Sequence, residues 1–247
     1  REGEAGKLPI VLIHGFAADL NAWRGLLAGA SLGHPVLALD LPGHGSSPRV
    51  APESVDAIAE MVEATLAAFG VTACLLAGHS FGAAVAAVVA ARGTADVRSL
   101  VLISSAGLGP EINGAFTKGL IAAKSEASVV PWLRLLVSDE SLLTRPFINA
   151  TVAQAGDDAL RAAQAAIADR FFADGAQTFE IRSAIAQLAM PVRLIFGAED
   201  RIIPASHAHG LPGKVGVHIF PRCGHMPQIE ERAAVLSVLA ECARAAS

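Results

Sequence analysis

Ser80 stands at the centre of the segment GHSFG, residues 78–82. An apolar run precedes this segment and a helical pattern follows it, so the serine lies between a predicted strand and a predicted helix. The pattern G-x-S-x-G in that context is typical of a nucleophile elbow, a tight turn that exposes the serine hydroxyl at the amino terminus of the helix. Gly78 and Gly82 leave the space that such a turn needs. The plainer interpretation is a strand–helix turn that merely tolerates a serine.

A nucleophilic serine needs a general base, and the base needs a carboxylate that orients it. Asp200 follows one later apolar run, and His225 follows the next. Loops at the carboxyl ends of adjacent parallel strands converge, so we expect Ser80, Asp200 and His225 to form a catalytic triad. Alternatives are open for both residues. Asp200 could be an acid that caps a loop, with the neighbouring Glu199 as the rival carboxylate, and His225 could be a loop histidine with a structural hydrogen bond.

A second glycine turn, His14-Gly15-Phe16, follows the first apolar run. Gly15 lets the backbone turn so that the N–H of Phe16 points toward a developing oxyanion. The N–H of Phe81, the residue after the serine, is the expected second donor of this oxyanion hole. We expect His14 to brace the loop by hydrogen bonding, and His79 to be structural too, rather than either one acting as the base.

The segment DLPGHG, residues 40–45, follows another apolar run. It could be a metal or acid–base site, but we favour a rigid loop that shapes the floor of a pocket. His207 and His209 are two positions apart and do not share a helix face, so we predict no metal site. The sequence also contains no glycine-rich dinucleotide loop and no P-loop.

These residues depend on elements that the apolar pattern predicts. Short apolar runs predict strands at 8–13, 36–39, 74–77, 100–103, 192–196 and 215–220. Most of these runs lack polar alternation, which is typical of parallel strands covered on both faces. Helical patterns alternate with these runs, at 53–69, 82–92 and 230–245. This alternation predicts an α/β fold with a doubly wound, mostly parallel sheet flanked by helices.

The alternation stops between residues 107 and 190. This segment is too long for a crossover and too apolar for a linker, and it has helical patterning at 116–126, 131–137, 141–155, 159–172 and 181–189. We predict a helical cap, 107–190, inserted into a core that comprises residues 1–106 and 191–247. Such a cap is expected to cover the carboxyl ends of the strands.

The composition of the 247 residues limits the class of protein. With 53% hydrophobic and 17% charged residues, the chain can bury a large core and is not a disordered protein. The net charge of −4, without a basic patch, indicates neither nucleic acid nor a membrane surface as a partner. Three cysteines and no signal peptide predict a cytoplasmic protein without a disulfide framework. Because the chain begins at Arg1 and not at Met, we expect a piece of a longer protein.

Five segments together resemble the α/β-hydrolase superfamily, namely HGF at 14–16, DLPGHG at 40–45, GHSFG at 78–82, GAEDRIIP at 197–204 and CGHMPQIE at 223–230. The resemblance covers nearly the whole chain. It implies an α/β-hydrolase fold with a helical cap and a triad of Ser80, Asp200 and His225. It also implies two strands before the first parallel one, for which this sequence has only residues 1–7.

Three further segments carry a closer likeness, namely SSAGLGPEIN at 104–113, HGFAADLNAW at 14–23 and FADGAQ at 172–177. They look like parts of the acetyltransferase (E2) component of bacterial acetoin dehydrogenase complexes, a dihydrolipoyllysine-residue acetyltransferase. In that component a lipoyl domain precedes an α/β-hydrolase-like domain. The likeness implies acetyl transfer from a dihydrolipoyl thioester to CoA, with the lipoyl domain and the other subunits of the complex as partners.

No lipoyl-attachment motif surrounds the four lysines Lys7, Lys118, Lys124 and Lys214. We therefore expect no cofactor bound covalently in this chain, with CoA and a lipoyl group from another domain as substrates. Lys118 and Lys124 could meet phosphates, but two lysines on a helix are more often solvated charges. The alternative function is a free-standing hydrolase of small esters, thioesters or C–C bonds, with water as the acceptor. A non-catalytic scaffold is a third interpretation, which an ordered triad disfavours.

Overall fold

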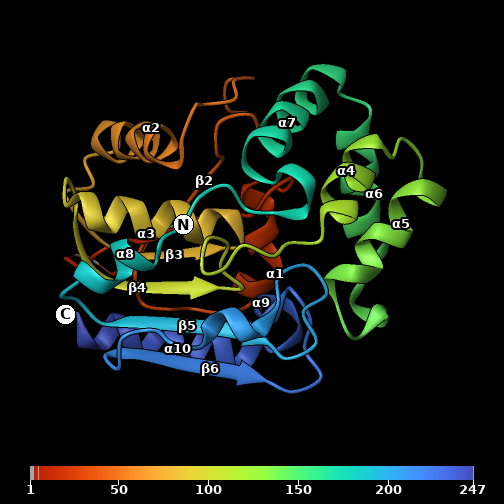
Figure 1. Ribbon diagram of the computed structural model, residues 1–247. Coiled ribbons are helices and arrows are strands. Elements are labelled where there is room, and N and C mark those ends of the chain that lie inside the picture. Colours follow the sequence, from red (N-terminus) through yellow and green to blue (C-terminus); the bar gives the residue numbers. More distant parts are fainter. Residues whose placement is uncertain (1–2, 5, 247) are drawn as a thin grey trace.

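The computed structural model describes residues 3–4 and 6–246 of the chain. In this part, six parallel strands form one sheet in the order β2-β1-β3-β4-β5-β6 (Figure 1). The strands are β1 (Ile10–Ile13), β2 (Val36–Leu39), β3 (Ala73–His79), β4 (Asp96–Ile103), β5 (Val192–Gly197) and β6 (Val215–Phe220). The predicted fold class, a mostly parallel sheet flanked by helices, is confirmed.

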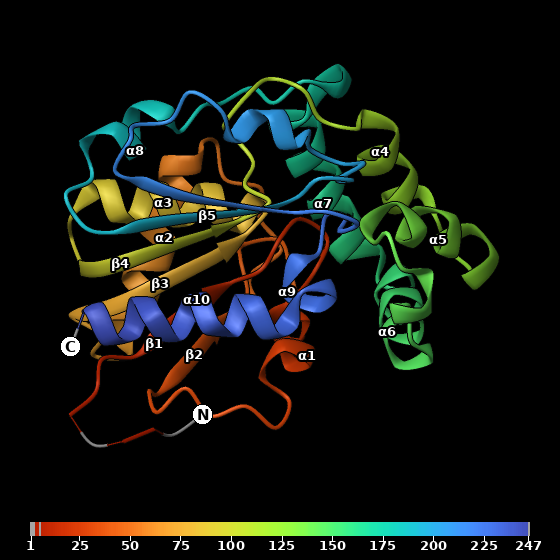
Figure 2. The ribbon, with the colours of Figure 1, turned by 90° about the horizontal axis from the view of Figure 1, so that it is seen from below.

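Helices cover both faces of the sheet (Figure 2). One face carries α2 (Val55–Ala68), α3 (Phe81–Arg92) and α8 (Arg182–Gln187), and the other carries α1 (Arg24–Leu27), α9 (Pro227–Glu230) and α10 (Arg232–Ala245). The central strands are buried on both sides, which explains their continuous apolar sequences. The edge strand β6 differs, because Val217 and Ile219 are 42% and 41% exposed. The cover on both faces that most of the apolar runs predict therefore does not extend to this strand.

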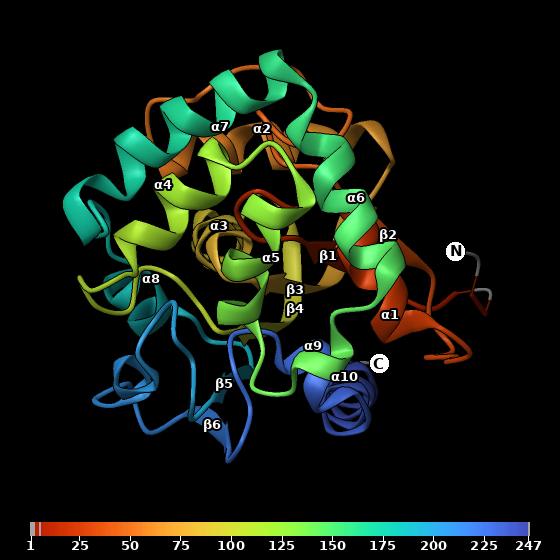
Figure 3. The same ribbon diagram turned by 90° about the vertical axis from the view of Figure 1, so that its right-hand side faces the viewer.

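The segment between β4 and β5 consists mainly of helices. It contains α4 (Gly114–Ala122), α5 (Glu126–Leu133), α6 (Arg145–Ala155) and α7 (Asp158–Phe171), followed by α8. Helices α4 to α7 lie together beyond the carboxyl ends of the strands, whereas α8 packs against α3 (Figures 1 and 3). The division into a core and a cap at residues 107–190 stays a prediction.

Several helix boundaries in this segment differ from the predicted ones, and two of the differences have a clear local cause. The helix expected to begin at Pro131 begins earlier, because Ser125 and Ser128 cap each other's backbone at its amino terminus, and the proline lies inside the helix. The helix expected to begin at Ser141 begins only at Arg145. Pro146 stands in its first turn, where the missing N–H costs no hydrogen bond.

The sheet ends at β2 on one side. Glu4 lies beside this edge and donates its N–H to the Gly33 carbonyl at 3.2 Å. The two strands that the resemblance implied would involve residues 1–7, of which 1, 2 and 5 lie outside the described residues. In the described part of the chain, no helix has both the length and the apolar character that crossing a membrane requires.

Candidate active site

Ser80 lies in the turn between β3 and α3 and has a strained backbone. Its φ of 54° and ψ of −118° are a conformation that non-glycine residues rarely adopt. The turn is as crowded as the sequence pattern predicts. A Cβ on Gly78 would lie 2.4 Å from the Gly82 carbonyl oxygen, and one on Gly82 would lie 2.1 Å from that of His14. Strong packing therefore holds the serine in this conformation despite its cost.

His225 and Asp200 form a buried pair. Nδ1 of His225 lies 2.8 Å from Oδ2 of Asp200, and the two side chains are 3% and 0% exposed. A neutral imidazole that donates from Nδ1 to the carboxylate keeps an acceptor lone pair on Nε2, which is what a general base needs. The rival acid Glu199 accepts a hydrogen bond from the Ser138 hydroxyl at 2.9 Å. The carboxylate that contacts His225 is thus that of Asp200.

His79 connects the serine turn to the His225 loop. Its Nε2 donates to the His225 carbonyl at 2.8 Å, and the two rings lie 4.9 Å apart. Burial, with the nearby His225 as a secondary cause, lowers the pKa of His79 to about 3, so this imidazole is neutral. Within the described residues the Ser80 hydroxyl makes no hydrogen bond. Bonds between nucleophile and base are often long in free enzymes and tighten when substrate binds.

The loop after β1 packs directly on the serine turn. A Cβ on Gly15 would lie 2.9 Å from Nδ1 of His79 and 3.1 Å from Cβ of Ser80. The backbone N–H groups of Phe16 and Phe81 have no acceptor among residues 3–4 and 6–246. The structure therefore brings two unpaired amide donors to the turn that carries the serine.

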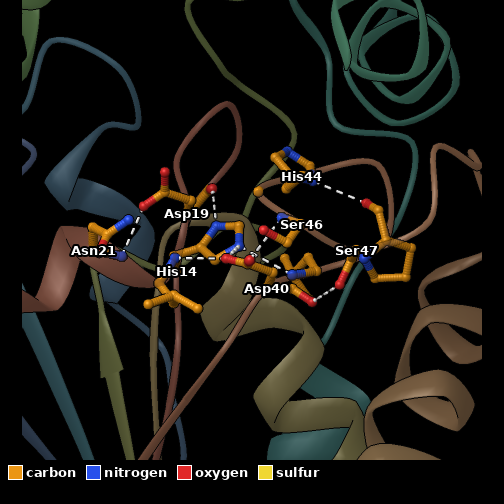
Figure 4. Close-up of polar contacts among 12 residues, drawn as sticks. His14, Asp19, Asn21, Asp40, His44, Ser46 and Ser47 are labelled. Atoms are coloured by element: carbon orange, nitrogen blue, oxygen red, sulfur yellow. Dashed lines mark hydrogen bonds and ion pairs between the residues drawn. The ribbon is translucent and has the colours of Figure 1, made fainter. Parts of the chain in front are cut away.

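His14 is fully buried and both of its ring nitrogens have backbone partners. Nδ1 donates to the Gly15 carbonyl at 2.8 Å, and Nε2 accepts the N–H of Leu41 at 3.0 Å (Figure 4). Burial lowers the pKa of His14, so the imidazole is neutral. It joins the loop after β1 to the loop after β2.

Asp40 holds the DLPGHG segment in shape (Figure 4). Its carboxylate accepts the N–H of Leu20 at 2.7 Å and that of Ser46 at 2.8 Å. A Cβ on Gly45 would collide with this carboxylate at 2.2 Å, so the loop closes around it. His44 is buried, and this burial, with the nearby His14 as a secondary cause, lowers the pKa of His44 to about 3. The segment is a rigid support beside the serine turn.

Aromatic residues of the helical segment cover the serine turn, and sequence reasoning missed them. The Phe81 ring lies 5.2 Å from that of Phe171, 5.3 Å from that of Phe172 and 5.8 Å from that of Phe179. Phe172 also packs against Phe16 at 5.4 Å. Adjacent phenylalanines in a chain with only 10 of them and no tyrosine were the available signal. They make the surroundings of Ser80 apolar.

Glu230 is a second residue that sequence reasoning missed. One of its carboxylate oxygens accepts the N–H of Ser138 at 2.6 Å and that of Asp139 at 3.2 Å. The other accepts the N–H of Gly224, next to His225, at 2.6 Å. The carboxylate thus ties the His225 loop to a turn of the helical segment that is distant in sequence.

The remaining candidate residues lie away from the serine. His207 bonds to Glu111, at 2.6 Å, and within the described chain no group of three or more potential ligands could hold a metal ion. Lys118 and Lys124 are exposed and form ion pairs with acidic residues of the helical segment. Such exposed pairs contribute little stability.

Comparisons with known proteins agree with this arrangement. A family model described as "alpha/beta hydrolase fold" matches residues 9–232. The dihydrolipoyllysine-residue acetyltransferase component of the acetoin cleaving system of Pseudomonas putida is 38% identical over 233 residues, covering 92% of this chain and 61% of that protein. The component of the same name from Cupriavidus necator is 34% identical over 227 residues, again covering 92% and 61%. The chain thus spans 61% of the length of both relatives.

Solved structures share the fold. A meta-cleavage product hydrolase from Pseudomonas fluorescens IP01 superimposes with a TM-score of 0.86 and 23% identity, covering 99% of this chain and 93% of that one. The resemblance that the sequence motifs indicated, to acetoin-system acetyltransferase components, is confirmed. On the family model and these relatives, the chain belongs to the α/β-hydrolase fold family.

Proposed function

We propose that this domain is an acyltransferase of the acetoin-cleaving type, which moves an acetyl group from a dihydrolipoyl thioester to CoA. The observation that carries the proposal is the 38% identity, over 92% of the chain, to an acetyltransferase component of an acetoin cleaving system. The buried His225–Asp200 pair and the strained Ser80 turn supply the groups that acyl transfer requires. The reaction is assigned to the cytoplasm.

In the proposed mechanism, Ser80, His225 and Asp200 act as a catalytic triad. Nε2 of His225 takes the hydroxyl proton of Ser80 while the serine oxygen attacks the thioester carbonyl. The carbon–sulfur bond then breaks, and His225 returns the proton to the leaving dihydrolipoyl thiolate. The CoA thiol attacks the acetyl-serine in the reverse sense and leaves as acetyl-CoA. Direct attack by CoA, with His225 as the base, is the other route.

The amide groups of Phe16 and Phe81 are proposed to form the oxyanion hole. Both have unpaired N–H groups in the described chain. Phe81 directly follows Ser80, and Phe16 follows Gly15 in the loop that packs on the serine turn. Preorganised donors stabilise the developing oxyanion without having to reorganise during the reaction, and one such donor contributes about 3–4 kcal/mol to lowering the barrier. Gly15, Gly78 and Gly82 permit the close packing that holds these donors in position.

The acyl donor is proposed to arrive on a separate lipoyl domain. Relatives named as acetoin-system components are longer than this chain, which covers 61% of their length. A lipoyl arm must reach Ser80 past the helices α4 to α7, which we propose form a cap over a core of residues 1–106 and 191–247. The other subunits of the acetoin-cleaving system are the proposed partners.

An acceptor competition tests the proposal. S-acetyl-dihydrolipoamide is supplied together with CoA, and the yields of acetyl-CoA and free acetate are measured for the wild type and for Ser80→Ala. We expect acetyl-CoA in excess of acetate, and its loss in Ser80→Ala. Acetate without acetyl-CoA would identify a hydrolase that uses water as the acceptor. Undiminished transfer by Ser80→Ala would rule out the covalent route.

Labelling with a fluorophosphonate tests whether Ser80 is an activated nucleophile, separately from the choice of acceptor. The reagent modifies an activated serine whichever acceptor the enzyme uses. We expect labelling of the folded wild type and none of Ser80→Ala. Absence of labelling in the folded wild type would favour the scaffold interpretation.

A further inference from the structure

Helix α7 contains a buried arginine whose hydrogen-bonding capacity is largely unused. Arg161 is 6% exposed, and in the described part of the chain its Nε and Nη2 atoms have no hydrogen-bond partner. Its Nη1 donates to Oε1 of Gln164 at 3.1 Å. Gln164 is fully buried, and its Nε2 likewise has no partner among the described residues. Guanidinium and carboxamide N–H groups are therefore gathered at one point with no acceptor.

Other arginines of this chain have acidic partners. Arg92 forms ion pairs with Glu60 and Glu63, and Arg49 pairs with Asp157 at the start of α7. Burial lowers the pKa of Arg161, and no carboxylate among the described residues counteracts this effect. Taking a charged group out of water is costly unless an opposite charge or good acceptors replace the water. A buried guanidinium without acceptors is therefore an indication that a ligand supplies them.

The position of Arg161 relates it to the proposed active site. Residues spaced by three or four positions share one face of a helix, and Arg161, Gln164, Ala168 and Phe171 have this spacing. Phe171 packs against Phe81, the residue after Ser80. Ten residues of helix separate Arg161 from Phe171, which is about 15 Å along the axis. Figure 3 shows α7 lying across the helical segment beside α4.

We propose that Arg161 and Gln164 form a binding subsite for an oxyanion at the far end of the substrate, carried either by the acyl chain or by the thiol. The unused N–H groups of both side chains suit a carboxylate or a phosphate, which a guanidinium binds through paired, charge-assisted hydrogen bonds. The reacting carbonyl lies at Ser80 and the anionic end lies two to three helical turns away, along the Phe171 face of α7. The inference rests on the proposed function only in placing the acyl carbon at Ser80.

Two pairs of substrates distinguish the sources of the oxyanion. On the acyl side, 4-nitrophenyl monoesters of dicarboxylic acids of increasing length are compared with the matching uncharged fatty acyl esters. On the thiol side, acetyl-CoA, which has phosphates, is compared with S-acetylpantetheine, which has none. The readout is the ratio of kcat/KM for the charged member to kcat/KM for the neutral one, because this ratio cancels general effects of a substitution on the catalytic step.

The variants are Arg161→Met and Arg161→Lys, with Arg170→Met as the matched control. Arg170 lies on the same helix but is exposed. We expect Arg161→Met to lower the ratio roughly 10- to 100-fold in one of the two pairs, as loss of charged hydrogen bonds does. Arg161→Lys should restore part of it, and Arg170→Met should leave it unchanged. Retention of the wild-type ratio by Arg161→Met in both pairs would overturn the proposal.

Calorimetric titration of Ser80→Ala with the same charged and neutral compounds measures binding without turnover. Preferential binding of a charged member, lost in Ser80→Ala/Arg161→Met, supports the subsite even if acetyl-CoA formation fails. Equal binding of charged and neutral members overturns the subsite, even if fluorophosphonate labels Ser80 and acyl transfer proceeds.

Discussion

The two oxygens of Asp200 have different partners, and this division explains its orientation. Oδ2 lies 2.8 Å from Nδ1 of His225, whereas Oδ1 accepts the N–H groups of Ile202 and Ile203 at 2.8 and 2.9 Å. The two backbone donors fix the carboxylate, and the carboxylate in turn fixes the tautomer and direction of the imidazole. A single side chain thus connects the loop after β5 to the proposed base.

We expect Asp200→Asn to reduce kcat for acyl transfer roughly 10⁴-fold with little change in the fold. The asparagine amide can keep the geometry, but its N–H₂ cannot accept from Nδ1 and favours the wrong tautomer of His225. Steady-state kinetics with S-acetyl-dihydrolipoamide and CoA measure the effect. Glu199→Gln is the control, since Glu199 contacts Ser138 instead. Equal losses in both variants would contradict the assigned role.

Residues that follow a strand directly were predictable, and residues that arrive from distant segments were not. Ser80, Asp200 and His225 are fixed by the ends of β3, β5 and β6, and strand ends are visible as apolar runs in the sequence. Arg161 resembles any other arginine on an alanine-rich helix, because its burial depends on how α7 packs against other helices. Tertiary contacts of this kind have no local pattern.

At the scale of elements, predictions were weakest among the helices between β4 and β5. Strands between two helix layers have one dominant pattern, a continuous apolar run, so five of the six were found with nearly their observed ends. The first residue of a short helix depends on which residue caps it. Where two possible caps lie close in sequence, the sequence alone does not indicate which of them begins the helix. At Ser125 a reciprocal side-chain cap begins α5 ahead of Pro131, although proline also favours a first turn.

Glu230 joins the turn at Ser138 and Asp139 to the loop that carries His225. Glu230→Gln keeps an acceptor for Ser138 and Asp139 but faces the N–H of Gly224 with an amide N–H₂. Leaving that backbone donor unpaired costs about 1–3 kcal/mol, or roughly 2–12 °C in Tm for a chain of this size. Because Gly224 precedes His225, we also expect slower fluorophosphonate labelling of Ser80, measured well below Tm.

Glu231→Gln is the matched control for this prediction, because the neighbouring side chain makes no hydrogen bond within the described residues. We expect it to leave both Tm and the labelling rate unchanged. A fall in Tm for Glu230→Gln with a wild-type labelling rate would restrict the role of Glu230 to stability and separate it from the positioning of His225.

At the scale of the whole molecule, the active-site region concentrates buried neutral histidines. His14, His44 and His79 all have a pKa below the ordinary value, about 3 for His44 and His79, and burial is the main cause in each case. In the unfolded chain these imidazoles titrate near pH 6.5. The loops around Ser80 therefore hold an acid-sensitive cluster at the junction of the sheet and the helical segment.

This cluster makes the free energy of unfolding depend on pH. Above about pH 7.5 the histidines are neutral in both states and contribute almost no pH dependence. Between pH 6.5 and the folded pKa of about 3, the unfolded chain binds protons that the folded chain excludes, so stability falls as the pH falls. Each such histidine contributes a slope that reaches about 1.4 kcal/mol per pH unit well below pH 6.5 and averages about half of that between pH 7.5 and 5.5. Urea unfolding between pH 7.5 and 5.5, a range chosen to lie mostly above carboxylate titration, measures that slope.

His44→Gln should reduce the slope by the contribution of one histidine, whatever its effect on stability at pH 7.5. Substitution of the exposed His209 should not change the slope. An unchanged slope in His44→Gln would mean that this imidazole protonates without unfolding the loops around Ser80.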